Sequence, residues 1–225
     1  MCGRYFLHST ADKLTLLFGE MPMPLLEPRY NIAPTQPVPV VRESTVGARE
    51  MVLLRWGLIP SWSKGPDSRF SMINARVETV AQKPAYRNAF RYRRCLIPAD
   101  GFFEWRAEGP NKQPYVLRPR DGRTLALAGL WEHWQDADGN EIESCTILVR
   151  AANAQVRPVH ERMPVVIAPK SFDLWLDIHS QKPQPLDTLL AVQQAPDLEI
   201  YPVSRALNNP KSGSPALIEP SGDPV

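Results

Sequence analysis

The sequence predicts an α+β fold built mainly from antiparallel β-strands, with helices at its edges. In the middle of the chain, short runs of apolar and β-branched residues alternate with turn dipeptides such as Asp121-Gly122 and Asp138-Gly139, which is typical of an antiparallel meander. The 24 prolines are about twice the usual share and favour turns and short strands over long helices. Helical patterns are few and short.

The length and composition are those of one soluble domain. The chain of 225 residues contains no linker, and its 43% hydrophobic and 22% charged residues are ordinary for a globular protein. No apolar run approaches the ~20 residues that span a bilayer, and no secretion signal opens the chain. Because three cysteines cannot all pair, we expect a reduced, cytoplasmic protein. A net charge of +2 is too small to indicate a nucleic-acid partner by itself.

The first half of the chain predicts helices, loops and one hairpin. Ser9 and Asp12 mark the start of a short helix over residues 11–18, and Gly19 stands at its stop position. Residues 21–39 contain six prolines and are expected to form a long irregular loop. We then expect a hairpin made by residues 38–42 and 51–56. A second loop is expected at residues 60–70 and a second helix at residues 85–92.

The second half of the chain predicts the meander itself and two further helices. Apolar runs separated by turn residues predict strands at residues 96–98, 101–105, 115–118, 124–131, 142–151, 164–167 and 198–203. Ser171 caps a helix that runs to residue 178, and Pro185 stands at the start of another over residues 186–192. The end of the chain, from Asn208, is rich in Pro, Gly and Ser and is expected to be loop or frayed.

The first residues of the chain offer unusual chemistry. Aminopeptidases remove an initiator Met when a small residue follows it, so we expect Met1 to be lost and Cys2 to become the amino terminus. The α-amine and thiol of Cys2 can then both add to one aldehyde carbon, first as an imine and then as a five-membered thiazolidine. An α-amine titrates at roughly pH 7.7–8, so a useful fraction is nucleophilic at neutral pH. The alternative is a Met-Cys start with no chemical role.

Glu104 and His160 are candidates for proton transfer. Because strand residues alternate between faces, Phe103 and Trp105 should point one way while Phe102 and Glu104 share the other. An apolar setting raises the pKa of a carboxyl group towards neutrality, whereas an exposed strand position would leave it ordinary. His160 carries the side chain best suited to proton transfer at pH 7, although a surface or core histidine is the alternative.

Arginines and aromatic residues form the mix expected of a groove for single-stranded nucleic acid. Guanidinium groups hold phosphates, and aromatic rings stack on bases or wedge between them. The alternative is ordinary solvated helix faces. The residues of this set are Arg4, Arg76, Arg87, Arg91, Arg93, Arg94, Tyr30, Trp62 and Phe70.

Metal and nucleotide sites are poorly supported. The cysteines lack C-x-x-C spacing, and no two histidines stand at helical i, i+4 separation. There is no Walker or Rossmann glycine-rich loop and no G-x-S-x-G elbow. We therefore expect no metal and no cofactor.

Seven motifs occur in order along the chain: MCGR at residues 1–4, RYNIAP at 29–34, WGLIP at 56–60, INARVET at 73–79, RCLIPADGFFEW at 94–105, HERMP at 160–164 and PVSR at 202–205. In this combination the sequence resembles the SRAP (SOS response-associated peptidase) family, whose members process abasic sites in single-stranded DNA. The match defines a single domain over residues 2–210 and a C-terminal tail over residues 211–225. Together with the strand pattern, it predicts curved sheets that form a barrel-like core with peripheral helices.

The resemblance implies a catalytic role for four residues. Cys2, once exposed, would form a thiazolidine crosslink with the ring-opened aldehyde of an abasic site. Asn74 would hold the opened deoxyribose, and Glu104 would shuttle protons during imine formation and ring closure. His160 would assist proton transfer and either reversal of the crosslink or strand cleavage.

The resemblance also implies a DNA-binding surface. Arg4 and Arg76 match positions that grip phosphates beside the lesion, Trp62 matches an aromatic wedge region, and Tyr30 completes the set of DNA-binding candidates. The expected partner is single-stranded DNA with abasic sites, bound by a monomer that associates with the nucleoid when it acts. Replication-fork proteins are further candidate partners, and no membrane partner is expected.

Two other functions remain open on the sequence. The family's older name suggests a cysteine peptidase or autopeptidase in which Cys2 attacks a peptide bond, with removal of Met1 as its expected work. The second is a non-catalytic module that binds single strands. Covalent capture of DNA, peptide cleavage and salt-sensitive retention distinguish the three functions.

Overall fold

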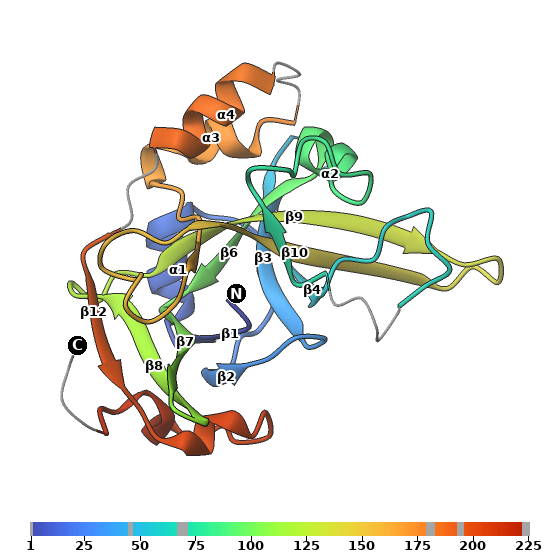
Figure 1. Cartoon of the computed structure of the whole chain (residues 1–225). Helices are drawn as coiled ribbons and strands as arrows, with labels where there is room; N and C mark the ends of the chain where they lie inside the picture. Colours follow the sequence, from blue (N-terminus) through green and yellow to red (C-terminus); the bar gives the residue numbers. More distant parts are fainter. Residues whose placement is uncertain (1, 45–46, 67–71, 179–182, 193–195, 222–225) are drawn as a thin grey trace.

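The structure is a computed structural model that describes residues 2–44, 47–66, 72–178, 183–192 and 196–221 (Figure 1). Its strands are β1 (Arg4–Leu7), β2 (Arg29–Ile32), β3 (Pro37–Glu43), β4 (Arg49–Trp56), β5 (Asn74–Arg76), β6 (Arg94–Ala99), β7 (Gly101–Glu108), β8 (Asn111–Pro119), β9 (Leu125–Gln135), β10 (Glu141–Ala151), β11 (Arg162–Pro164) and β12 (Leu198–Pro202). Its α-helices are α1 (Ala11–Phe18), α2 (Arg87–Tyr92), α3 (Phe172–Leu176) and α4 (Pro183–Val192). The α+β prediction is confirmed.

A closed barrel forms the larger part of the molecule. Strands β10, β4, β3, β6 and β9 pair in that order, and β9 pairs back with β10 to close the ring. Most of these pairs are antiparallel, but β10 runs parallel to β4 and to β5. The predicted barrel-like core is therefore present, with two parallel pairings that a simple meander would not contain.

A second sheet of five strands lies beside the barrel, in the order β12, β8, β7, β1, β2. One face, with Tyr5, Phe102 and Leu117, belongs to the main core. The other face, with Phe6 and Phe103, packs under the end of the chain. Figure 1 shows β1 at the centre of the molecule, with α2, α3 and α4 at one end and the C-terminal turns at the other.

Two sequence predictions differ from the structure, and part of a third concerns residues that the structure does not describe. The segment 21–39 is not wholly irregular, because β2 forms within it by pairing with β1, and β3 already begins at Pro37. The strand expected at residues 164–167 lies at Arg162–Pro164, where it pairs with the end of β10. In the expected loop at 60–70, residues 67–70 lie outside the described part of the chain, and so does Phe70.

Residues 208–221, the described part of the C-terminal segment, are packed rather than frayed. Residues Pro215–Ile218 form a 3₁₀ turn whose Leu217 is buried against the outer face of the second sheet. The main chain of Pro220 forms a β-bridge with Val203. Burial of Leu217 offsets the entropy cost of ordering this Pro- and Ser-rich segment, which local composition does not reveal.

Candidate active site

Cys2 lies two residues before β1, inside the protein. Its side chain is fully buried, and its thiol lies 4.0 Å from the main-chain oxygen of Arg4. Burial raises the pKa of the Cys2 thiol, and the nearby charge of Glu104 raises it further. The thiol is therefore protonated at neutral pH, and it must give up a proton before it can act as a nucleophile.

Asn74 holds the main chain of Cys2. It lies at the first position of β5, which pairs in parallel with β10 and places Asn74 opposite Ile147. The side-chain amide of Asn74 donates a hydrogen bond to the carbonyl oxygen of Cys2 over 2.9 Å. Its own side-chain oxygen is buried and accepts no hydrogen bond from the described residues. This oxygen is an acceptor that a substrate hydroxyl or the α-amine of Cys2 could satisfy.

Glu104 is a buried carboxyl group in β7, and its side chain is only 2% exposed. Phe103 and the packed ring of Trp105 face the C-terminal segment, whereas Phe102 faces the main core, so the predicted alternation is confirmed. The exposed-strand alternative for Glu104 is wrong. Burial raises the pKa of Glu104 to about 7, because the charged form loses hydration in this setting.

His160 faces Glu104. Its Nε2 lies 3.9 Å from Oε2 of the carboxyl group. Its Nδ1 lies 3.0 Å from the backbone nitrogen and 3.2 Å from the carbonyl oxygen of Arg162, and when it accepts from that N–H the neutral ring carries its proton on Nε2, the atom that faces Glu104. Burial lowers the pKa of His160, which favours this neutral form at pH 7.

The four predicted catalytic residues therefore gather in one place from four distant segments. Hydrogen bonding joins Asn74 to Cys2, and charge proximity joins Cys2 to Glu104 and Glu104 to His160. The arrangement combines the thiol of Cys2, a carboxyl group that titrates near neutrality and an imidazole that faces this carboxyl group. Such a set can move protons at a carbonyl or imine carbon placed beside Cys2.

The predicted DNA-binding residues lie in different environments. Arg76 is exposed, two residues beyond Asn74 on β5. Arg4 is partly buried, and its Nη1 donates to the Asn31 side chain over 2.8 Å and to the Leu207 carbonyl over 3.0 Å. Arg4 thus has both a structural role and donors left over.

The two aromatic candidates differ in their exposure. Trp62 is 68% exposed on the loop after β4. Tyr30 is partly buried and stacks on His8, with ring centroids 5.6 Å apart. The contacts of the described residues join neither ring to the catalytic group.

The predicted arginine groove is wrong for Arg93 and Arg94. Arg94 is fully buried and donates to the carbonyl oxygens of Phe90, Arg91, Trp175 and Asp177. Arg93 pairs with the buried carboxylate of Glu132 over 2.8 Å. These guanidinium groups hold α2 and α3 against the barrel, because buried carbonyls at helix ends need donors.

Two further residues around the site were not identified from the sequence. Asn31 accepts from Arg4 and donates to the carbonyl oxygens of Asn209 and Ser212 over 3.0 and 2.9 Å. The carboxylate of Asp100 accepts hydrogen bonds from the backbone N–H of His8, just after β1, and from the hydroxyl of Thr124. Both stand in the ordered motifs, but only the three-dimensional contacts show what each one holds.

Within the residues that the structure describes, no helix is long and apolar enough to cross a membrane. The same residues contain no group of three or more His, Cys, Asp or Glu side chains that could hold a metal ion.

Comparisons with known proteins find one family over most of the chain. The profile of the family described as SOS response associated peptidase (SRAP) matches residues 1–210. A Bacillus subtilis protein named abasic site processing protein YoqW is 38% identical over 223 residues, which cover 97% of this chain and 99% of that protein. The Escherichia coli abasic site processing protein YedK is 31% identical, with 98% and 100% covered.

A solved structure supports the fold. A crystal structure of a protein from Bacteroides thetaiotaomicron superposes with a TM-score of 0.83, covering 98% of this chain and 100% of that chain. Its sequence identity is 24%, so this similarity concerns the fold alone.

Proposed function

The chain belongs to the SRAP family, and from this premise we propose that it captures abasic sites in single-stranded DNA through a thiazolidine formed by Cys2. Relatives at up to 38% identity are named abasic site processing proteins. The observation that carries the proposal is the hydrogen bond from Asn74 to the Cys2 carbonyl, next to a buried carboxyl group whose pKa is raised to about 7.

The reaction begins with the sugar of the abasic site. Ring opening moves a proton from the anomeric hydroxyl to the ring oxygen and exposes the aldehyde. A carboxyl group that titrates near pH 7 can accept the first proton and deliver the second. Glu104 has this property, and the free side-chain oxygen of Asn74 can accept a hydrogen bond from a hydroxyl of the opened sugar.

Covalent capture then takes two bond-forming steps. The α-amine of Cys2, free once Met1 has been removed, adds to the aldehyde carbon and gives a carbinolamine, which loses one water to become an imine. Protonated Glu104 assists departure of that water. The thiol then adds to the imine carbon while its proton passes to the nitrogen, which closes the five-membered ring.

His160 serves the later steps in this proposal. The neutral ring presents Nε2–H towards Glu104 and so can relay protons between the carboxyl group and the adduct. The same relay runs backwards when the thiazolidine reopens to the imine. Loss of a proton from the sugar carbon next to the imine carbon would instead form a C=C bond and expel the phosphate on the following sugar carbon, which breaks the strand.

DNA binding completes the proposal. Arg76 is exposed beside Asn74, where it can neutralise a phosphate next to the lesion, and Arg4 can add its unused donors. Trp62 offers an exposed indole for stacking, and Tyr30 offers a second ring. A single strand suits such a site, because the lesion is reached without the cost of opening a duplex.

The test uses uracil-containing single-stranded DNA treated with uracil glycosylase. We expect a denaturation-resistant protein–DNA band with the chain that has lost Met1, and no band with Cys2→Ala. Intact mass shows whether Met1 is present in the preparation. A band of equal intensity with Cys2→Ala, or with Met1 retained on every molecule, would overturn the proposal.

The peptidase alternative requires a reactive thiolate. Burial raises the pKa of the Cys2 thiol, which works against direct attack on a peptide bond. Peptide cleavage without a crosslinked band in the same assay would nevertheless favour that function.

A further inference from the structure

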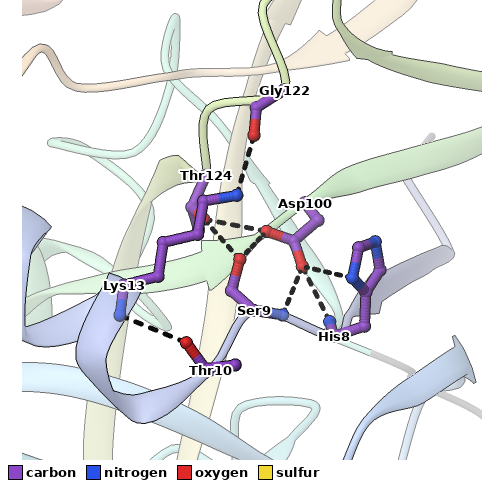
Figure 2. A network of polar contacts seen from close by, with 7 residues as sticks. All are labelled: His8, Ser9, Thr10, Lys13, Asp100, Gly122 and Thr124. Carbon is purple, nitrogen blue, oxygen red and sulfur yellow. Dashed lines mark hydrogen bonds and ion pairs between the residues drawn. The ribbon is translucent and has the colours of Figure 1, made fainter.

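The DGFFEW motif contains a second acidic residue, Asp100, which the proposed chemistry does not use. Its carboxylate is buried at the corner between β6 and β7, with its side chain only 6% exposed. Figure 2 shows that its two oxygens face the segment that follows β1 on one side and Thr124 on the other. A buried carboxylate costs several kcal/mol unless it is fully hydrogen-bonded.

Four hydrogen bonds satisfy this carboxylate. One oxygen accepts from the backbone N–H groups of His8 and Ser9, both over 2.7 Å. The other oxygen accepts from the hydroxyl of Ser9 over 2.5 Å and from that of Thr124 over 2.8 Å. The backbone N–H of Asp100 also donates to the carbonyl of Phe6 over 2.9 Å. Asp100 therefore holds the end of β1 through Phe6 and the segment directly after it through His8 and Ser9.

The hydrogen bonds of Asp100 act beside strand pairing and burial, since Tyr5 and Phe6 of β1 are fully buried on opposite faces of the sheet. This strand has four residues and pairs with β7 at only three positions, Arg4 with Phe103, Tyr5 with Phe102 and Phe6 with Gly101. Its pairing with β2 on the other side is irregular between Tyr5 and Leu7. The carboxylate of Asp100 adds hydrogen bonds to His8 and Ser9, directly after the short strand.

Both reacting partners depend on that register. Cys2 precedes β1, whereas Glu104 lies on β7. A slip of one residue would move Cys2 by about 3.3 Å along the sheet and turn its side chain to the other face. It would also break the 2.9 Å hydrogen bond between Asn74 and the Cys2 carbonyl.

We propose that Asp100 is a positioning residue, whose carboxylate fixes the register of β1 against β7 and thereby sets the position of Cys2 relative to Glu104 and Asn74. The inference rests on the proposed crosslinking function and assigns to Asp100 no contact with the DNA.

The experiment is a double-mutant cycle on the single-turnover rate of crosslinking at saturating abasic single-stranded DNA. Asp100→Ala removes the carboxylate that accepts hydrogen bonds from His8, Ser9 and Thr124. We expect a crosslinking rate at least about tenfold lower, because misplacement of a reacting group by 1 Å can cost about 100-fold. The dissociation constant for the DNA should stay within about threefold. In the Glu104→Gln background, Asp100→Ala should slow the reaction by less than about threefold, because the proton transfer that depends on the register is already lost.

Thr124→Val is the matched control. It removes one hydroxyl from the same carboxylate but leaves the hydrogen bonds from the backbone N–H groups of His8 and Ser9 intact. We expect a lower melting temperature, a crosslinking rate within about twofold of the parent and an effect that multiplies with that of Glu104→Gln. A purely structural role of Asp100 would make Asp100→Ala behave in the same way as this control.

Asp100→Asn keeps the test decisive if Asp100→Ala does not fold. The carboxamide oxygen can still accept from the two N–H groups, but a neutral acceptor forms hydrogen bonds about half as strong. We expect a slowing of about threefold that again disappears in the Glu104→Gln background. A parental rate for every folded Asp100 variant, or effects of Asp100 and Glu104 that simply multiply, would overturn this inference alone. A parent that forms no crosslink would overturn the proposed function and this inference with it.

Discussion

The side-chain amide of Asn74 lies 2.9 Å from the carbonyl oxygen of Cys2 and donates to it. This hydrogen bond joins β5, which pairs with β10 of the barrel, to Cys2, which lies just before β1. It orients the backbone of Cys2, and with it the α-amine that is proposed to attack the aldehyde. A bond to the main chain, rather than to the thiol, leaves both nucleophiles of Cys2 available.

Asn74→Ala should therefore slow crosslinking without preventing DNA binding. The substitution leaves the Cys2 carbonyl without this donor, at a cost of about 1–3 kcal/mol, and removes the acceptor proposed for the sugar hydroxyl. We expect a rate reduced by about 10- to 100-fold and a dissociation constant within about threefold. Asn74→Asp, which retains the size but loses the donor, should be similarly slow. A parental rate for both variants, measured on DNA-saturated protein, would contradict this role.

Glu104 should make folding stability depend on pH. Its pKa is about 7 in the folded protein against an ordinary value of 4.5, so the folded state binds the proton more tightly. The contribution of Glu104 to stability is full below pH 4.5 and is lost as the pH rises through 7, by roughly 3 kcal/mol in total. Glu104→Gln should remove this dependence, so that the variant gains stability relative to the parent between pH 5 and about pH 8. Thermal unfolding of both proteins across that range measures the difference, and parallel curves would refute the raised pKa.

His160→Ala should slow release of the adduct. The neutral imidazole presents Nε2–H to Glu104, and general acid–base groups contribute about 10²- to 10⁴-fold. We expect a longer half-life of the purified crosslink, with its formation less affected. His133→Ala is a suitable control, because that exposed histidine lies 3.5 Å from Glu141 on the β9–β10 hairpin. Equal decay times for the His160 and His133 variants would exclude the relay.

Arg76→Ala should weaken binding of single-stranded DNA and change its salt dependence. An arginine that neutralises one phosphate contributes about 0.7 to the slope of log K against log salt on a single strand. We expect the slope to fall by about that amount, uniformly across sequences. Arg123→Ala is the control, because Arg123 is also exposed but lies on the turn between β8 and β9, paired with Asp121. An unchanged slope for Arg76→Ala would remove this residue from the interface.

Arg94→Lys should lower stability and leave DNA binding unchanged. The buried guanidinium of Arg94 donates to four carbonyl oxygens, and a lysine ammonium cannot reproduce that planar fork. Several carbonyls would lose their donor, at a cost of about 3 kcal/mol or more. Chemical denaturation measures the loss, whereas the salt slope of DNA binding should equal that of the parent. A variant with parental stability but weaker DNA binding would contradict this prediction and indicate that Arg94 contacts DNA.

The sequence by itself determined the strand pattern and the chemical inventory of the site. Period-2 alternation around Glu104 correctly placed it on the same face as Phe102, because side-chain direction along a strand is a local property. The hairpins β3–β4, β7–β8 and β9–β10 and the helix at Ala11–Phe18 were readable for the same reason. The single meander expected through the middle of the chain is wrong, because β7 and β8 pair in the second sheet whereas β6, β9 and β10 pair in the barrel.

Only the tertiary structure decided which of these groups meet. Closure of the barrel and insertion of β1 between β2 and β7 place Cys2, Asn74 and Glu104 together, although they are far apart in sequence. Burial turned Arg94 from a predicted phosphate ligand into a structural donor, and pairing with β1 made a strand of the proline-rich segment around Arg29–Ile32. Desolvation and long-range strand pairing depend on which segments distant in sequence pack against a residue, and local propensity does not contain that information.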